Sequence, residues 1–380
     1  MDKKTFAILV STMFLSMLGF GIVVPLLPIY ADQLGATALE IGLINGGFGL
    51  AIVVFLPVMG RFSDRIGRKV FLCSGLACLT IASLGFIWAQ TSLQLILVRC
   101  FQGFAASMHM PIAQAYLGDI TPPGEEGKWM GRFNAVLYGG MGAGPLFGGV
   151  LTDLFSINTA FLVMAALMLF GLIATIIFLP KVAKKTTLQN QGMSFTDMRK
   201  SNIMKGAFAV RMAIGFATAS LMTFLPLFAS QNLGLSVSLI GLLIASRMPM
   251  ALLQSYTGTL ADKYSRRGLV IAGGVVAIIS TALLPTANSF WPLLAMYIFA
   301  VIGVYFAVPA VTAYVVEEGR TFGMGASMAM FMMAMQIGMG VGPILFGGLV
   351  DLTGIESAFY SGAGILLLGI AAFVWFVRKY

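Results

Sequence analysis

The sequence predicts an all-α membrane protein of twelve transmembrane helices, arranged as two six-helix halves that are parallel repeats. Three observations support this prediction. Of the 380 residues, 59% are hydrophobic and 10% are charged, whereas roughly 25% of residues are charged in a typical soluble domain. Twelve apolar runs approach or exceed the roughly 20 residues that a membrane-spanning helix needs. Residues also recur at an offset of 198 over most of the chain.

The twelve predicted spans follow the apolar runs in chain order. Each should be helical, because backbone groups inside lipid must form hydrogen bonds within their own segment. The first run is too long for the apolar core of a signal peptide and has no small-residue cleavage site, so we interpret it as a membrane helix. The spans cover residues 5–30, 40–60, 70–89, 94–118, 129–151, 158–180, 205–228, 237–259, 269–286, 290–315, 324–348 and 357–377.

The basic residues predict how these spans are oriented. With the amino terminus in the cytoplasm, 20 of the 23 Lys and Arg residues fall in cytoplasmic segments, and the other three, Arg99, Arg211 and Arg247, lie inside spans. The loops on the opposite side contain no Lys or Arg, in agreement with the positive-inside rule. We therefore predict a multi-pass protein of the cytoplasmic (inner) membrane of a prokaryote, with both termini cytoplasmic. The net charge of +9 is then a topology signal and not a nucleic-acid-binding surface.

The recurring offset indicates that the chain is a duplication. Because six spans is an even number, both halves enter the membrane from the same side, as parallel repeats do. The prediction is an N-terminal half over residues 1–180, a polar cytoplasmic linker over 181–203 and a C-terminal half over 204–380. The residues that match between the halves include Pro28 and Pro226, Asp64 and Asp262, Pro145 and Pro343, and Asp153 and Asp351.

A glycine- and charge-rich loop joins the second and third spans. It has the sequence Gly60-Arg61-Phe62-Ser63-Asp64-Arg65-Ile66-Gly67-Arg68-Lys69, and the second half keeps a reduced form from Gly258 to Arg267. Glycines permit a tight connection, and a carboxylate at a helix end can bind the positive amino-terminal end of another helix. Together with twelve spans and a duplication, this loop resembles the signature of the major facilitator superfamily, and the resemblance extends over the whole chain.

The resemblance implies the major facilitator fold and a conformational latch at this loop. Asp64 is expected to cap the start of the eleventh span, near Gly323, when the transporter is open outward, and Arg68 is expected to pair with Asp119. The repeat predicts a corresponding pair of Arg266 and Glu317. The alternative is that these charges only mark topology on a solvated loop, where ion pairs are weak. The residues assigned to the latch are Gly60, Asp64, Arg65, Gly67, Arg68, Asp119, Asp262, Arg266 and Glu317.

The fifth span contains a glycine-proline pattern from Gly139 to Gly149, which recurs from Gly338 to Gly348. Small residues at helical spacing let helix backbones approach closely in lipid, and proline bends a helix. On the fifth span the pattern resembles that of the twelve-span drug/proton antiporter branch of the superfamily. The first-span sequence from Gly19 to Tyr30 and the run from Leu97 to Gly103 resemble the same branch. The residues assigned to helix packing are Gly140, Gly144, Pro145, Gly148, Gly149, Gly342 and Pro343.

Polar groups inside the spans are the candidates for a substrate or proton cavity. A charge near the bilayer centre costs roughly 2.5 to 3.5 kcal/mol on insertion scales, so it is expected to serve a function. Arg211 lies near a span end and can reach the headgroups, whereas Arg247 lies mid-way along its span and cannot easily do so. Arg99 is expected to face the central cavity. A histidine can titrate near physiological pH, although a packing role is the alternative for His109. The cavity candidates are Arg99, Gln102, His109, Arg247 and Gln336.

All 14 acidic residues lie at span ends or in loops. Many proton-coupled exporters of cationic drugs that resemble this family place an Asp or Glu within the first, seventh or tenth span, and this sequence departs from that pattern. The departure argues against cationic drugs and favours anionic or neutral amphipathic solutes. If protons are coupled, we expect His109, Asp119 or Glu317 to carry them.

Two functions remain open. The first is a secondary active transporter that works by alternating access and exports small amphipathic compounds in exchange for protons. The second is an uptake or exchange carrier for an organic anion or metabolite, with Arg99 and Arg247 binding it. A transport-inactive sensor would be favoured by an added soluble domain, which the sequence lacks. We expect no enzymatic activity, cofactor, metal site or nucleic-acid partner. The expected partners are a small-molecule substrate, a proton and the lipid bilayer, and the protein is expected to be a monomer.

Overall fold

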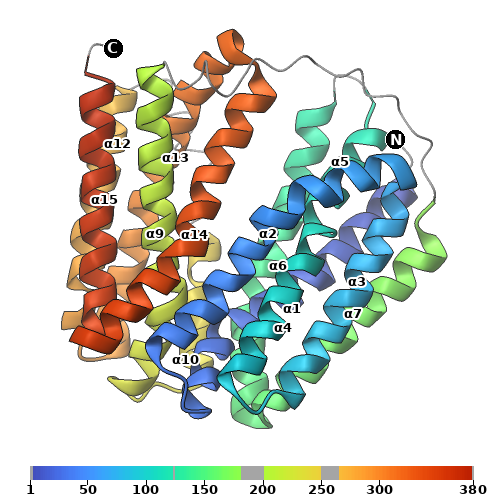
Figure 1. The fold of residues 1–380 in the computed structure, drawn as a ribbon, viewed down its shortest axis with the longest axis horizontal. Helices are drawn as coiled ribbons and strands as arrows, with labels where there is room; N and C mark the ends of the chain where they lie inside the picture. Colours follow the sequence, from blue (N-terminus) through green and yellow to red (C-terminus); the bar gives the residue numbers. More distant parts are fainter. Residues whose placement is uncertain (1–2, 123–124, 181–200, 250–264, 379–380) are drawn as a thin grey trace. The chain divides into compact units, whose positions relative to one another are not determined.

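The computed structural model describes residues 3–122, 125–180, 201–249 and 265–378. Over these residues every regular element is a helix (Figure 1), which confirms the all-α fold class. The helices of the first part of the chain are α1 (Lys3–Gln33), α2 (Ala38–Ile66), α3 (Arg68–Trp88), α4 (Ser92–Ser107), α5 (Met110–Ile120), α6 (Glu126–Leu154) and α7 (Ile157–Phe178). The later helices are α9 (Asn202–Gln231), α10 (Val237–Ala245), α12 (Arg266–Leu283), the short 3₁₀ helix η1 (Leu284–Thr286), α13 (Phe290–Phe322), α14 (Met324–Thr353) and α15 (Glu356–Phe376).

Eleven helical segments within the described residues are long and apolar enough to cross a membrane. They correspond to eleven of the predicted spans, and α4 and α5 together form one of them, Ser92–Ile120. A shorter apolar helix begins the predicted eighth span at Val237, and residues 250–259 of that span lie outside the described part of the chain. The protein is therefore a multi-pass membrane protein.

The fourth span differs from the single uninterrupted helix that we predicted. Helix α4 ends at Ser107 and α5 begins at Met110. The amides of Met108 and His109 donate to carbonyls three residues earlier instead of four, at 3.1 Å each. Pro111 follows directly, and it has no backbone N–H with which to continue the helical hydrogen bonds. The span is thus interrupted at His109.

The described residues form two compact units. Unit 1 comprises Met1–Ala36, Leu43–Thr187 and Gly234–Ala245. Within it, α1 packs against α6 and α7, α3 packs against α7, and α10 packs against α6. Large side chains such as Tyr116 and Phe133 are fully buried in its core. In lipid such packing is stabilised by close contacts between helices, because lipid tails are as apolar as the side chains.

Unit 2 comprises Thr37–Gly42, Leu188–Leu233 and Ser246–Tyr380. Helix α9 packs against α14 and α15, and α12 packs against α13 and α15. The units do not coincide with the predicted halves, because α10 is part of unit 1 and the first turn of α2 is part of unit 2. Most of the predicted linker, residues 181–200, lies outside the described residues.

Candidate functional site

Arg68, the first residue of α3, is the centre of a polar cluster in unit 1. Its Nη2 lies 2.5 Å from the Asp64 carboxylate, and its Nε donates to Asp119 Oδ2 at 3.2 Å. Its Nη1 donates to Ser63 Oγ at 2.7 Å, and Ser63 in turn donates to the Gly60 carbonyl. The guanidinium is 18% exposed and Asp64 is 54% exposed, so the cluster is only partly shielded from water.

Gly67 makes the tight turn between α2 and α3 that brings Arg68 to these acceptors. Its φ is 125°, a conformation that strongly favours glycine because any Cβ would strain it. Its counterpart at the offset of 198 is Ser265, which has a φ of −56° and caps α12 through a bond from the Gly268 amide. The two halves therefore begin their third helices in different ways.

The matching cluster in unit 2 is smaller. Arg266 Nη1 donates to Glu317 Oε2 at 2.8 Å, and its guanidinium lies 5.7 Å from the Tyr314 ring centroid. Arg266 is 34% exposed and Glu317 is 65% exposed. Asp262, which was also assigned to the latch, lies outside the described residues.

The predicted contact of Asp64 with the eleventh span remains a prediction. Asp64 belongs to unit 1, whereas the start of α14 belongs to unit 2. Arg65, at the end of α2, is exposed. Of the residues assigned to the latch, Asp64 and Asp119 contact Arg68, and Glu317 contacts Arg266.

Arg99 on α4 is buried inside unit 1, with 8% of its side chain exposed. Its Nη1 donates to Gln102 Oε1 at 2.5 Å, and its Nη2 lies 3.5 Å from Asn45 Oδ1. The guanidinium also lies over the Phe48 ring, 4.3 Å from its centroid. Arg99 Nε and Gln102 Nε2 are buried without a hydrogen-bond partner among the described residues.

The neighbours of Arg99 are polar or aromatic and uncharged. No described carboxylate forms an ion pair with it. A buried charge is normally paired, because leaving water is costly unless an opposite charge compensates. Within the described part of the chain, the guanidinium is thus held by uncharged groups and has no counter-charge.

Arg247 is the second intramembrane candidate and lies in unit 2, just after α10. It is partly buried, and its Nη1 lies 3.3 Å from Met222 Sδ on α9. Tyr297 of α13 is fully buried, and its hydroxyl has no hydrogen-bond partner in the described part of the chain. Gln336, the candidate on α14, is also partly buried.

The repeat relates these two arginines in an unexpected way. At the offset of 198, Arg99 matches Tyr297. Around the second span the offset is 199, since Ile41-Gly42-Leu43 matches Ile240-Gly241-Leu242, and Phe48 then matches Arg247. Each half therefore carries one guanidinium and one aromatic ring at the same two places, with the two partners exchanged.

His109 lies at the interruption between α4 and α5 and is 1% exposed. Neither ring nitrogen has a hydrogen-bond partner among the residues that the structure describes. Gly75 of α3 packs here, since a Cβ on it would lie 3.2 Å from the Met108 backbone. The structure thus brings Arg99 and Gln102 together, and among the described residues no hydrogen bond joins His109 to either of them.

The glycine-proline pattern on α6 is a packing surface. A Cβ on Gly140 would lie 2.7 Å from the Phe14 carbonyl oxygen, one on Gly144 would lie 2.5 Å from the Leu18 carbonyl oxygen, and one on Gly148 would lie 3.0 Å from the Ile22 Cα, all three on α1. A Cβ on Gly149 would contact the backbone of Val237 and Ser238 at the start of α10. A Cβ on Gly241 of α10 would contact the Pro145 carbonyl. Real Cβ atoms essentially never come as close to backbone as they would at Gly140, Gly144 and Gly149, so these positions require glycine. At Gly148 a side chain would need a small shift of α1.

Unit 2 repeats this surface on α14. Gly338 meets the backbone of α9 around Met212 and Gly215, and Gly342 meets Ala219 and Phe216. Gly42, near the start of α2, packs against the Pro343 carbonyl. In unit 1, Gly241 packs against the Pro145 carbonyl in the same way.

Two carboxylates that we did not predict to be functional cap helix starts. Asp153 of α6 accepts hydrogen bonds from the Val237 and Ser238 amides of α10, at 3.2 and 2.8 Å. Asp351 of α14 accepts from the Ala38 and Leu39 amides of α2, at 2.8 and 2.9 Å. The match of Asp153 with Asp351 in the repeat was the sequence signal that could have identified them.

Comparison with known families decides the class of protein. The chain matches the Major Facilitator Superfamily over residues 9–325 and 207–380. It belongs to the major facilitator superfamily. An uncharacterized MFS-type transporter of Methanocaldococcus jannaschii is 30% identical over 382 residues, which cover 98% of each protein.

Other superfamily members extend the comparison. Quinolone resistance protein NorA of Staphylococcus aureus is 27% identical over 377 residues, covering 97% of this chain and 95% of NorA. Among solved structures, a bacterial homolog of the human lysosomal transporter Spinster superposes with a TM-score of 0.84, over 99% of this chain and 97% of that chain. Its sequence identity is 17%, so this likeness shows the fold alone and confirms the two-half superfamily architecture.

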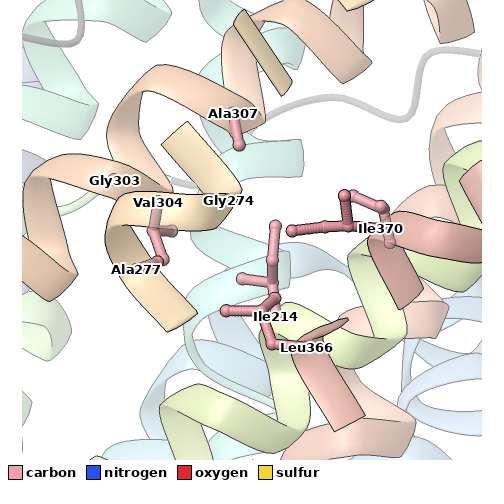
Figure 2. A pocket seen from close by; sticks show the side chains of 9 residues that line it. Ile214, Gly274, Ala277, Gly303, Val304, Ala307, Leu366 and Ile370 are labelled. Atoms are coloured by element: carbon pink, nitrogen blue, oxygen red, sulfur yellow. The ribbon is translucent and has the colours of Figure 1, made fainter. Parts of the chain in front are cut away.

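A superfamily transporter must bind its solute, and the small cavity in unit 2 cannot do so. It has a volume of about 10 Å³, which is about the space of one water molecule. Its lining comes from α9, α12, α13 and α15 and is apolar throughout, including Ile214, Ala277 and Ile370 (Figure 2). It contains none of the predicted site residues and reflects the close approach of helices at glycines such as Gly274 and Gly303.

Proposed function

We propose that this protein is a secondary active transporter that exports small amphipathic compounds by alternating access, in exchange for protons. The observation that supports this best is the 27% identity with quinolone resistance protein NorA over nearly the full length of both chains. Rigid packing of α1 on α6 through glycines suits a mechanism in which bundles of helices move as bodies. The fold itself does not select the substrate, since one fold serves many functions.

The proposed location is the cytoplasmic membrane of a prokaryote, with both termini in the cytoplasm. The described connection that carries Arg65, Arg68 and Lys69 is then cytoplasmic, and the ends of α6 and α14 face outward. The predicted loops on that outer side contain no Lys or Arg, which supports the assignment. The proposed working form is a monomer.

The clusters around Arg68 and Arg266 are proposed to act as cytoplasmic latches. Arg68 binds two carboxylates from different helices and a serine hydroxyl, so breaking its contacts would free Asp64 to cap the start of α14. Each cluster is partly exposed, so each ion pair alone contributes little, and the latch would depend on several contacts breaking together.

A second candidate function is the uptake or exchange of an organic anion. It is favoured by one observation: among the described residues, the buried guanidinium of Arg99 has only uncharged neighbours, and Arg99 Nε and Gln102 Nε2 have no hydrogen-bond partner. A carboxylate on the solute would supply the missing negative charge, and charge-assisted hydrogen bonds of this type are the stronger ones. In this reading Arg99 and Arg247 bind the anion.

Transport in proteoliposomes under an imposed pH gradient tests both candidates. We would compare ethidium, a lipophilic cation, with the neutral dye Nile red and with benzoate. The exporter proposal expects proton-driven movement of at least one of the two dyes. Movement of benzoate alone, lost in Arg99→Ala and kept in the exposed control Arg132→Ala, would replace it with the anion carrier. Movement of none of the three, with refolded protein present, would reject both.

A further inference from the structure

An open groove lies between α1 and α7 of unit 1. Its volume is about 220 Å³, compared with about 10 Å³ for the apolar cavity in unit 2. The residues that line it belong neither to the latch clusters nor to the cavity candidates. Those that shape its two walls are Ala7, Ser11 and Leu15 of α1 and Phe170, Ala174 and Phe178 of α7.

Small side chains between large ones make the groove. On each helix the wall residues are four apart, and residues at this spacing lie on one face of a helix. On α7, Ala174 leaves a gap between two phenylalanines, and on α1 the wall begins with the small residues Ala7 and Ser11. Eight residues of helix rise about 12 Å, which is most of the roughly 15 Å of hydrocarbon in one leaflet. The groove is therefore long enough for one acyl chain.

Lysines lie where α1 begins and where α7 ends. A Cβ on Gly171 would lie 3.7 Å from the Thr12 carbonyl oxygen, so the end of α7 lies beside the start of α1. Lys4 is exposed and precedes Ala7 by three residues, on the same face of α1. Lys69 Nζ donates to the Ile176 carbonyl at 2.8 Å. The acidic residue within these two helices is Asp32, at the opposite end of α1, so this end of the groove is basic.

The repeat shows what fills the corresponding place in unit 2. At the offset of 198, Ala7 matches Lys205 and Phe178 matches Phe376. Lys205 Nζ lies 5.8 Å from the Phe376 ring centroid, so an alkyl chain from α9 lies against that ring. Phe376 is partly buried, whereas Phe178 is 57% exposed. Unit 1 leaves this place open and has its lysine one turn nearer to the helix start, at Lys4.

We propose that the groove between α1 and α7 binds one anionic phospholipid, with an acyl chain between Phe170 and Phe178 and the phosphate against Lys4. The acyl chain takes the place that the Lys205 side chain fills in unit 2. Basic residues at the membrane surface attract anionic headgroups, and Lys69 adds a second positive charge at the end of α7. The inference depends on the membrane location of the protein and not on the compound that it transports.

Lipid binding by the full-length protein tests the proposal. Delipidated protein in detergent would be titrated with phosphatidylglycerol and, separately, with phosphatidylcholine, and native mass spectrometry would count the lipids bound. We expect the first phosphatidylglycerol to bind about tenfold more tightly than the first phosphatidylcholine, because the headgroup of the latter carries its own positive charge. Equal affinity for the two lipids would overturn the proposal.

The variant Ala7→Lys separates the shape of the groove from its charge. It adds a positive charge but fills the groove as Lys205 does in unit 2, so the affinity for the first phosphatidylglycerol should fall about tenfold. Ala371→Lys is the matched control, because Ala371 is exposed near the end of α15 and outside the groove, and it should not weaken binding. A fall in both variants, or in neither, would contradict the site.

Lys4→Ala tests the headgroup contact. This variant should lose the preference for phosphatidylglycerol over phosphatidylcholine and still bind one lipid through the groove. A preference that stays as large as in the natural protein would show that the phosphate binds elsewhere, which overturns the assignment of Lys4.

Photolabelling locates the site in the natural protein, so this result does not depend on how well the variants fold. A phosphatidylglycerol with a diazirine in its acyl chain should label peptides covering 5–15 and 168–178, and unlabelled phosphatidylglycerol should compete better than phosphatidylcholine. Labelling confined to other helices would reject the groove as the site. A dimer in native mass spectra whose α1 and α7 escape labelling would assign the groove to a second copy of the chain and would equally overturn the proposal.

Discussion

Unit 1 and unit 2 contain most of the first and second repeat of the sequence, respectively, but they differ in the chemistry of their interiors. Unit 1 places a guanidinium on α4 over a ring on α2, and unit 2 places a guanidinium just after α10 against the Met222 sulfur on α9. By contrast, the aspartate caps, the glycine-proline contacts and an Arg-acid pair occur in both. The duplication has therefore kept the parts that join helices and changed the positions of the intramembrane guanidinium groups.

The helices around two matching prolines also differ between the units. Pro111 and Pro309 match in the repeat, yet the span of Pro111 is interrupted at His109 while α13 continues through Pro309. Proline removes one helical hydrogen bond in each case. The interruption therefore depends on the surroundings of Met108 and His109, and proline alone does not cause it.

The largest expected effect comes from removing the buried charge of unit 1. Arg99→Met should abolish transport and at the same time raise the unfolding temperature, because the charge is buried without a described counter-charge. We expect a gain of about 1 to 3 kcal/mol, in the range seen when buried ionic groups are replaced by apolar ones. Thermal unfolding in detergent and the dye assay measure the two effects.

The corresponding change in unit 2, Arg247→Met, should give a smaller gain in stability because that side chain is less buried. A fall in unfolding temperature for Arg99→Met would show that this arginine stabilises the fold. That result would contradict the interpretation that Arg99 is kept for transport at a cost in stability.

The glycine contacts should differ in strength between the units. A Cβ at Gly144 would overlap the Gly21 and Leu18 backbone, whereas one at Gly342 would meet mainly the Ala219 and Phe216 side chains. We expect Gly144→Ala to cost about 1 to 3 kcal/mol, as overpacking does, and Gly342→Ala to cost less. Thermal unfolding gives the order, with Gly364→Ala as control because its Cβ would meet open space. Equal losses at Gly144 and Gly364 would contradict the packing role.

The two arginine clusters should also differ in how much they contribute to the free energy of unfolding. Arg68→Ala removes three interactions of a guanidinium that is 18% exposed, whereas Arg266→Ala removes one ion pair at 34% exposure. After allowance for solvent screening, we expect a loss of about 1 kcal/mol for Arg68 and less than about 0.5 kcal/mol for Arg266. Denaturation midpoints of the two variants measure this, and a larger loss for Arg266 would reverse the ranking.

The smallest effect concerns the starts of the third helices. Ser265→Ala removes a hydroxyl cap and should cost about 0.5 to 1 kcal/mol. Gly67→Ala, at the matching position of unit 1, should cost somewhat more because alanine rarely adopts its φ of 125°. Hydrogen exchange at the first turns of α12 and α3 localises each effect, and a neutral Gly67→Ala would mean that the turn can relax.

Much of the fold could be predicted from the sequence. Apolar runs indicated the spans, and Arg68 and Asp119 were identified as a pair because their family motif carries that information. The caps of Asp153 and Asp351 could not be predicted, since a repeat shows which residues correspond but not which helix start each one reaches. The swapped positions of arginine and aromatic ring in the two halves were also missed, because Phe48 matches Arg247 only when the repeat offset is 199 and not 198. The structure fixed that shift through the packing of Gly42 and Gly241.

The histidine at the interruption between α4 and α5 is also well suited to study by NMR spectroscopy. His109 is the single histidine among 380 residues, so imidazole labelled with nitrogen-15 would give resonances from one site only. Because both ring nitrogens lack partners among the described residues, their chemical shifts should respond strongly to any new hydrogen bond or water molecule. The natural sequence thus contains a reporter of rearrangement at the α4–α5 junction, and no labelling mutation is needed to observe it.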